Sequence, residues 1–243
     1  MYETLSEFYD ELTFDAEYDK RTEYILKLFE KFGSAPKSII DLACGTGSFS
    51  RRFADRGIKT VGVDCSPEML TTAESKNHGE VFYICQKAEN LALLEKAEGA
   101  VCLLDGLNHI TDYSKLKKAF KRLSLNLKPH SLFIFDMNTL YKHKTVLGNN
   151  TIVKETQDTF LVWQNCLRKD NKTVDIYLDI FKKSGEDKYI RSCDTVTEKA
   201  YTNEEIISAL SEAGFKFKRV YGEFTYRKPK ENCQRAVFIA EKI

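Results

Sequence analysis

Residues 38–50 read SIIDLACGTGSFS, and this stretch decides the fold. An apolar run ends in a single carboxylate, Asp41, and a turn that contains Gly45 and Gly47 follows directly. A short apolar run is typical of a buried strand in a parallel sheet, and such sheets bind ligands at the carboxyl ends of their strands. Glycine lets the backbone approach a ligand without a Cβ atom in the way. The stretch therefore predicts a ligand-binding loop at the edge of a parallel sheet.

Short apolar runs alternate with helical patterns up to about residue 140. The first helix has Asp19 as its predicted N-cap and Gly33 beyond its end, and a later one has Ser66 as its cap. Another carries an apolar stripe from Leu116 to Leu127 and ends before Pro129. Alternating strands and helices predict a doubly wound α/β fold, with right-handed crossovers and both faces of the sheet covered. The expected strands are 38–43, 59–64, 80–86, 99–105 and 131–138, and the expected helices are 18–32, 48–56, 66–75 and 112–128.

The texture of the sequence changes after residue 140. Between Val174 and Ile180, apolar residues fall on one face while Asp175 and Asp179 fall on the other, as in a half-exposed antiparallel strand. After residue 201, a Thr-x-x-Glu capping box starts another helix, and two strands then form a hairpin at the sheet edge. We expect an α/β domain over 1–148, an inserted antiparallel β lid over 149–201, and a return to the α/β domain over 202–243.

Composition excludes several classes of partner. With 37 Lys+Arg against 36 Asp+Glu and a net charge of +1, the chain has no overall field that would attract nucleic acid or an anionic membrane. The cysteines form no Cys-x-x-Cys pair, no apolar run is long enough to span a bilayer, and the histidines show no metal-binding spacing. We expect a cytoplasmic protein without a metal site, and without a membrane or nucleic-acid partner. The oligomeric state stays open.

A second carboxylate makes the glycine loop look like a nucleoside site. Asp64 ends the next predicted strand, about 20 residues after Gly45, where a carboxylate can accept hydrogen bonds from both ribose hydroxyls. A dinucleotide fingerprint needs a third glycine where this chain has Ser50, and Asp41 would repel the phosphates. S-adenosylmethionine (SAM) offers an ammonium group and a ribose without phosphate. The loop therefore favours SAM over a nicotinamide dinucleotide.

Four segments together carry a family resemblance: DLACGTG at 41–47, VGVD at 61–64, SPEML at 66–70 and LLDGLNHI at 103–110. They resemble the class I SAM-dependent methyltransferases, whose fold is a mostly parallel seven-stranded sheet. The closest likeness is to small bacterial members with two Tyr-Asp pairs near the N-terminus, here at Tyr9 and Tyr18. The resemblance covers roughly residues 5–140, and SEAGFKF at 211–217 extends it toward the C-terminus. One departure is Ala43, which stands where the family frequently has its first glycine.

The resemblance implies a role for each matching position, with SAM as the cofactor. The implied cofactor-binding residues are Asp41 and the backbone of Ala43, Cys44, Gly45 and Gly47 for the methionine part, Asp64 for the ribose, Cys65, Met69, Ala88 and Glu89 for the adenosine, Asp105, Leu107 and Asn108 for the methyl end, and Tyr9 and Tyr18 as a lid.

The expected function is transfer of a methyl group from SAM to a small-molecule acceptor by in-line displacement. The sulfonium supplies the reactivity, so the protein has to align the reacting atoms and exclude water. An amine acceptor needs no strong base, whereas a hydroxyl or carbon acceptor needs proton removal, for which His109, Asp105 and Tyr9 are candidates. The inserted sheet is expected to roof the acceptor site. The alternatives are a non-catalytic SAM-binding protein and an NAD(P)-dependent oxidoreductase.

Overall fold

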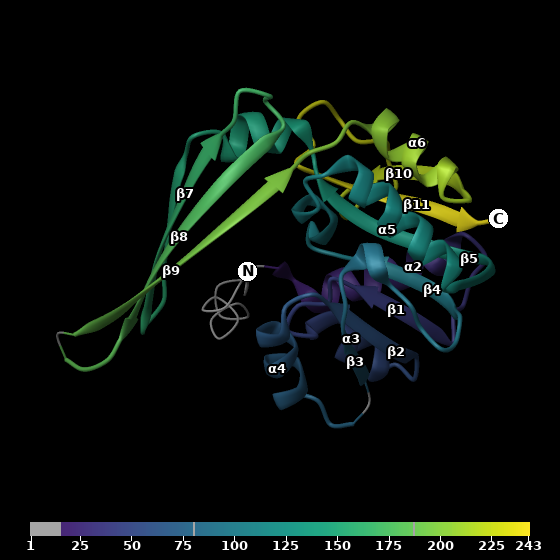
Figure 1. Ribbon diagram of the computed structural model, residues 1–243, viewed down its shortest axis with the longest axis horizontal. Helices are drawn as coiled ribbons and strands as arrows, with labels where there is room; N and C mark the ends of the chain where they lie inside the picture. The colour runs from purple at the N-terminus through teal and green to yellow at the C-terminus, as the bar shows by residue number, and fades with distance from the viewer. Residues whose placement is uncertain (1–15, 80, 187) are drawn as a thin grey trace.

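The computed structural model describes residues 16–79, 81–186 and 188–243. A seven-stranded sheet with helices on both sides forms the main body, and a four-stranded sheet projects from it as a long arm (Figure 1). The strand order is β10-β11-β5-β4-β1-β2-β3. The five strands from β5 to β3 in this order run parallel, and β11 is antiparallel to both of its neighbours, β5 and β10. This confirms the doubly wound prediction. The strands are β1 (Ser38–Leu42), β2 (Lys59–Asp64), β3 (Val81–Cys85), β4 (Ala97–Cys102), β5 (Leu127–Asn138), β10 (Phe215–Gly222) and β11 (Arg235–Lys242).

Alternate residues of the central strands pack against helices on opposite faces of the sheet. Ile39 of β1 belongs to one apolar cluster with Phe29 of α2, whereas the next residue, Ile40, belongs to another with Phe120 of α5. This two-residue period places a buried core on each side and leaves the carboxyl ends of the strands open for a site. None of the helices in the described ranges is both long and apolar enough to cross a membrane. The α-helices are α2 (Tyr18–Lys31), α3 (Ser48–Ala54), α4 (Pro67–Ser75), α5 (Tyr113–Leu125) and α6 (Asn203–Glu212).

Two predicted helix boundaries are wrong. Glu17, with a left-handed φ of 49°, occupies the N-cap position of α2, and Asp19 lies in the first turn, where it accepts a 2.7 Å hydrogen bond from Arg52. Helix α5 ends at Leu125, and Leu127 already pairs with Ala97 as the first residue of β5. The helical spacing of Leu127 was misleading because the chain needs an extended residue there to enter the sheet. The Ser66 cap is confirmed, since its hydroxyl accepts a hydrogen bond from the Met69 amide at 3.2 Å.

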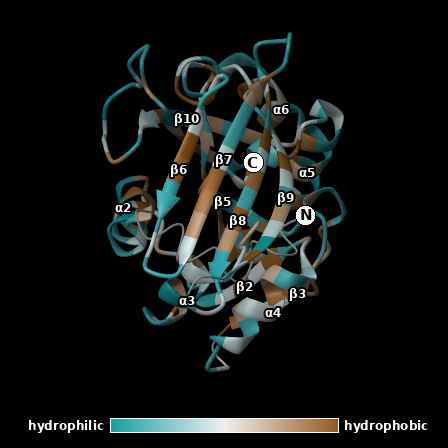
Figure 2. Ribbon diagram, turned by 90° about the vertical axis from the view of Figure 1, so that its left-hand side faces the viewer, coloured by the Kyte–Doolittle hydropathy of each residue, from teal (hydrophilic) through white to brown (hydrophobic). Residues whose placement is uncertain are grey.

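The four-stranded sheet is antiparallel with the order β6-β7-β8-β9, seen face-on in Figure 2. In β8, residues Val174 and Ile180 are fully buried, whereas Asp175 and Asp179 accept hydrogen bonds from arginines on the opposite face, which confirms the predicted alternation. The apolar face of the sheet therefore turns toward the body of the protein. The strands are β6 (Thr151–Glu155), β7 (Thr159–Leu167), β8 (Thr173–Lys183) and β9 (Tyr189–Lys199).

The chain returns to the main sheet through α6, as the sequence predicts. Thr202 and Glu205 form the expected capping box at the start of α6, and Gly214 follows its end with a φ of 84°. Strands β10 and β11 then form an antiparallel hairpin that adds to β5. The return therefore brings β11, including its first residue Arg235, beside the carboxyl end of β5.

Candidate cofactor and acceptor sites

Every second residue of the loop after β1 has a left-handed backbone conformation. Ala43, Gly45 and Gly47 have φ values of 56°, 55° and 74°. A Cβ atom on Gly47 would lie 2.1 Å from the Tyr83 hydroxyl, whereas a Cβ atom on Gly45 would meet nothing within 4 Å. Gly47 is thus required by space as well as by φ, and Gly45 by φ alone. Ala43 adopts a conformation that is strained for any residue with a side chain.

Asp64 fastens this loop to the end of β2. Its two carboxylate oxygens accept 2.9 Å hydrogen bonds from the backbone amides of Gly45 and Ser66. Burial raises the pKa of the Asp64 carboxyl, although these backbone hydrogen bonds oppose the rise. Each oxygen has a second lone pair, so the group can still accept hydrogen bonds from a ligand that carries two neighbouring hydroxyls.

Asp41 is a second buried carboxylate close to the loop. It is 1% exposed, and the Ser50 hydroxyl donates a 2.5 Å hydrogen bond to it. Burial raises the pKa of Asp41 to about 7, although the Ser50 hydrogen bond acts in the opposite direction. A cationic group that enters beside Asp41 would stabilise the ionised carboxylate. The pair of carboxylates therefore suits a ligand with an ammonium group and a ribose.

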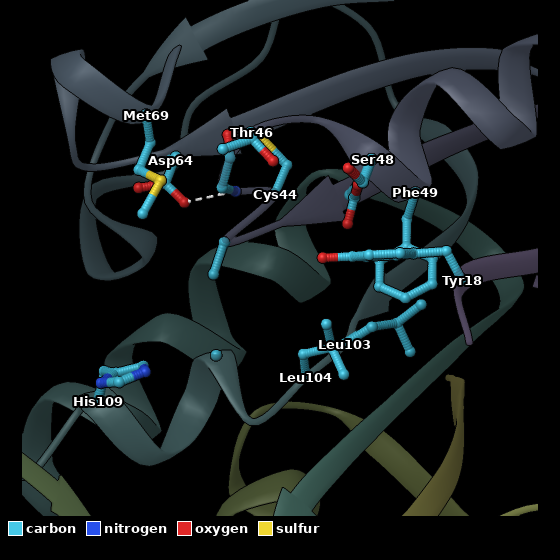
Figure 3. A pocket seen from close by; sticks show the side chains of 14 residues that line it. Tyr18, Cys44, Thr46, Ser48, Phe49, Asp64, Met69, Leu103, Leu104 and His109 are labelled. Carbon is cyan, nitrogen blue, oxygen red and sulfur yellow. Dashed lines mark hydrogen bonds between the residues drawn. The ribbon is translucent and has the colours of Figure 1, made fainter. Parts of the chain in front are cut away.

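Asp41, Asp64 and the glycine loop line a narrow cleft of about 70 Å³. Figure 3 shows Asp64 and Met69 on one side of it, Tyr18 and Phe49 on the other, and His109 below. The Tyr18 and Phe49 ring centroids are 5.0 Å apart. The buried Cys44 thiol also lines the cleft, and burial raises its pKa well above the ordinary value, which keeps the thiol neutral.

A second hollow of about 280 Å³ adjoins the cleft and shares Asp64 and His109 with it. Cys65, Ala88 and Glu89 line this hollow. The structure thus gathers the residues predicted for the ribose and the adenosine on one continuous wall. Leu107 also contributes to the hollow, although it is only 1% exposed.

A third cavity, of about 380 Å³, lies between the main sheet and the four-stranded sheet. Asp105, Lys142 and Arg235 line it on the side of the main body. Among the described residues, His109 alone lines the cleft, the second hollow and this cavity. His109 therefore marks the point where the three spaces meet. The apolar wall contributed by the four-stranded sheet consists of Ile152, Leu161, Trp163, Ile176, Leu178 and Val196.

A buried ion-pair network shapes the loop between the cleft and the third cavity. Leu104 and Asp105 have left-handed φ values of 53° and 56°, and their backbone amides donate to the Asp136 carboxylate at 3.0 and 2.8 Å. Arg235 joins the two carboxylates, with its guanidinium 2.6 Å from Asp136 and 2.6 Å from Asp105. Glu223 lies 3.3 Å from the same guanidinium. The strained loop is thus held by a carboxylate that Arg235 neutralises.

The network also sets the charge of the groups around it. Burial alone would raise the pKa of Asp105, but Arg235, Lys142 and His109 together outweigh it and hold that pKa below the ordinary value. Burial, with Arg235 nearby, lowers the pKa of Lys142. Carboxylate oxygens of Asp105 and Glu198 and a ring nitrogen of His109 lie within 4.8 Å of one another, a geometry that could hold a metal ion. Because Asp105 already pairs with Arg235, a metal cation there would face a fixed positive charge.

Among the predicted site residues that the structure describes, Gly47 and Asn108 line none of these cavities. Asn108 is fully buried and lines none of the three: its amide group donates to the carbonyls of Asn138 and Lys199, and its oxygen accepts from the Asn138 amide. It ties the loop to β5 and to the end of β9. Tyr9 lies outside the residues that the structure describes.

The sequence reasoning missed the charged residues of the third cavity. Lys142, Glu198 and Arg235 come from three distant segments, and the sequence patterns gave no role to any of them. One signal was present in Arg235, a charged residue at the start of an apolar strand. Another was Asp136, which interrupts the apolar run of β5.

Comparisons with known proteins agree with this geometry. A family model described as a methyltransferase domain matches residues 39–130. The Bacillus subtilis protein YqeM is 29% identical over 245 residues, which cover 100% of this chain and 97% of that protein. The crystal structure of a SAM-dependent methyltransferase from Clostridium acetobutylicum is 30% identical, with a TM-score of 0.89 over 99% of this chain and 98% of that one. The CcbJ methyltransferase of Streptomyces caelestis, 16% identical, shares the fold with a TM-score of 0.82 over 98% of this chain and 96% of that one. The chain belongs to the class I SAM-dependent methyltransferases, and SAM is its cofactor.

Proposed function

We propose that this methyltransferase acts on a small molecule held in the 380 Å³ cavity beneath the four-stranded sheet. The observation that carries the proposal is the position of His109, on the wall of both the cofactor cleft and this cavity. A cavity of this size is within the range of small-molecule sites, about 300–1,000 Å³.

The proposed roles of the cofactor residues follow from their contacts. The Asp41 carboxylate pairs with the ammonium group of the methionine part, and the loop from Ala43 to Gly47 covers that part. Asp64 accepts hydrogen bonds from the ribose hydroxyls, and the wall formed by Cys65, Ala88 and Glu89 contacts the adenosine. In this arrangement the sulfur lies nearest His109.

The chain itself has mainly to position the reacting atoms. The sulfonium of SAM supplies the reactive methyl group when bound. Alignment of the acceptor in a dry cavity can then lower the barrier, because the reacting atoms are already in contact. Asp105 is a poor candidate for the general base, since Arg235 lowers its pKa and holds it as an ion pair.

Labelled SAM tests the size class of the acceptor. The protein is incubated with methyl-tritiated SAM and a desalted cell extract supplemented with its own low-molecular-weight fraction. We expect the label to enter small molecules, and the Asp64→Ala variant to lose this transfer. Label that enters RNA or protein instead would contradict the proposal, and no transfer with intact SAM binding would favour a non-catalytic SAM-binding protein.

A further inference from the structure

Glu198 is a buried carboxylate that the four-stranded sheet brings to the acceptor cavity. It lies in β9, is 4% exposed and lines the cavity beside Lys142 and Trp163. One of its oxygens is within 4.8 Å of a ring nitrogen of His109. The C-terminal end of β9 thus places a carboxylate next to the point where the cofactor cleft and the cavity meet.

One side chain holds Glu198 by a hydrogen bond, and a buried histidine lies beside it. The Asn138 amide donates a 2.9 Å hydrogen bond to its Oε2 atom. His143 Nε2 lies 3.5 Å from the same oxygen, and His143 is fully buried. His143 Nδ1 lies 2.8 Å from the Lys172 carbonyl oxygen, which can only accept, so Nδ1 carries a hydrogen, while Nε2 faces Glu198 without forming a hydrogen bond. The orientation of the carboxylate is therefore set by Asn138, which also lines the cavity.

The second oxygen of Glu198 is available to a ligand. Within residues 16–79, 81–186 and 188–243, no donor forms a hydrogen bond with Oε1. A ligand N–H or O–H that reaches the cavity can therefore donate a hydrogen bond to this oxygen. The other wall of the cavity is apolar, with Leu161, Leu178 and Val196 facing it. The cavity therefore offers one hydrogen-bond acceptor next to an apolar surface.

Resting on the proposed function, we propose that Glu198 binds the nucleophile of the acceptor, an amine or hydroxyl attached to an apolar body, and takes its proton during transfer. The lone pair of the nucleophile forms the bond to the methyl carbon. The sulfur–methyl bond breaks, and its electron pair stays on sulfur. The N–H or O–H proton passes to the Glu198 carboxylate, so that charge and atoms balance.

Every cation that lines the cavity within the described ranges, including Lys154, already has a partner, which argues against an anionic acceptor. The Arg235 guanidinium is taken up by Asp105 and Asp136, and that of Arg21 lies 2.6 Å from Glu223. Lys142 donates its 2.9 Å hydrogen bond to the Asn138 amide oxygen. A carboxylate on the acceptor would have to displace one of these partners and would also face Glu198, whereas an amine or hydroxyl meets an available acceptor.

Three probes that share one apolar body test this assignment: cyclohexylmethylamine, cyclohexanemethanol and cyclohexanecarboxylate. Each is titrated by calorimetry into protein saturated with S-adenosylhomocysteine, whose own binding is measured first. We expect the amine and the alcohol to bind at least about tenfold more tightly than the carboxylate. In Glu198→Gln, amine affinity should fall about tenfold while carboxylate affinity stays equal or rises. Glu155→Gln, on an exposed position of β6, should change none of these values.

The change in preference separates a ligand contact from a structural role, because a collapsed cavity would weaken all three probes together. A carboxylate that binds most tightly to the wild type, an unchanged amine affinity in Glu198→Gln, or no binding of any probe at millimolar concentration would each overturn the inference. Loss of S-adenosylhomocysteine binding in the wild type would instead remove the proposed function on which it rests. Product mass after incubation with SAM then shows whether nitrogen or oxygen receives the methyl group.

Discussion

The cofactor cleft and the acceptor cavity of this protein are built in different ways. The cleft is lined almost wholly by two neighbouring strand-to-helix loops and the loop after β4, within residues 41–109, with Tyr18 added from α2. The cavity draws its lining from segments between Ala16 and Arg235. The cleft relies on backbone conformation and two carboxylates, whereas the cavity relies on side chains from both sheets. In our proposal, local sequence thus holds the general cofactor, and the tertiary fold holds the acceptor.

Buried charge is also treated differently in the two regions. No described cation forms an ion pair with Asp41 or Asp64, and burial raises the pKa of both. In the cavity, Asp105 and Asp136 share the Arg235 guanidinium, and the pKa of Asp105 is lowered. The two carboxylates of the cleft therefore lack a counter-charge until a cationic ligand binds, whereas Arg235 already neutralises the carboxylates beside the cavity. Mutations in the two regions should have separable effects.

The largest expected effect is a loss of stability when the ion pairs of Arg235 with Asp105 and Asp136 are removed. Arg235→Met leaves two buried carboxylates without their cation and should lower the free energy of unfolding by about 3–5 kcal/mol. Urea titration measures it, with Arg227→Met on an exposed loop as the control. A loss below about 1 kcal/mol would show that the cavity does not depend on this ion pair.

The next effect falls on the cofactor side. Asp64→Ala removes the carboxylate that fastens Gly45 and, in our proposal, binds the ribose, so affinity for S-adenosylhomocysteine should fall about a hundredfold. Calorimetry gives the dissociation constant, and Asp55→Ala at the end of α3 is the matched surface control. An unchanged constant would remove the ribose assignment.

Acid should weaken the cofactor side selectively. Because burial raises the pKa of Asp41 to about 7, lowering the pH from 8 to 6 protonates it and removes the charge that the ligand ammonium pairs with. Affinity for S-adenosylhomocysteine should then fall about tenfold in the wild type and remain nearly flat in Asp41→Asn. In the ligand-free protein the sign is opposite: a carboxyl with a raised folded-state pKa loses stability as the pH rises from about 4 through about 7. Asp41→Asn should therefore melt above the wild type at pH 8, and a lower melting temperature would contradict the assigned pKa direction.

The smallest effect concerns strain in the glycine loop. Ala43 has a φ of 56°, and Ala43→Gly should raise the free energy of unfolding by up to about 1 kcal/mol, since glycine removes the left-handed penalty at some cost in chain entropy. Ala54→Gly, at the end of α3, should instead lower it by up to about 1 kcal/mol. If both variants lose stability equally, the loop at Ala43 is not strained in solution.

The same contrast explains what could be predicted from the sequence. The strand, turn and cap signals around Asp41, Gly45, Asp64 and Ser66 are local, so the doubly wound class and the position of the glycine loop could be predicted from the sequence pattern, and the family resemblance added the seven-stranded sheet. Leu127 was misplaced because its apolar character fits both a helix stripe and a strand. Glu198 received no role because its meaning depends on His143 and Asn138, which only the folded chain brings beside it. The sequence pattern could indicate an inserted sheet, but not which of its residues reach the cavity.

A crystal structure of the complex with S-adenosylhomocysteine tests the central claim most directly. We expect the amino acid part to lie beside Asp41, the ribose to contact Asp64, and the sulfur to face the acceptor cavity beside His109. A sulfur atom that points away from this cavity, with protein between it and Glu198, would rule out the proposed acceptor site.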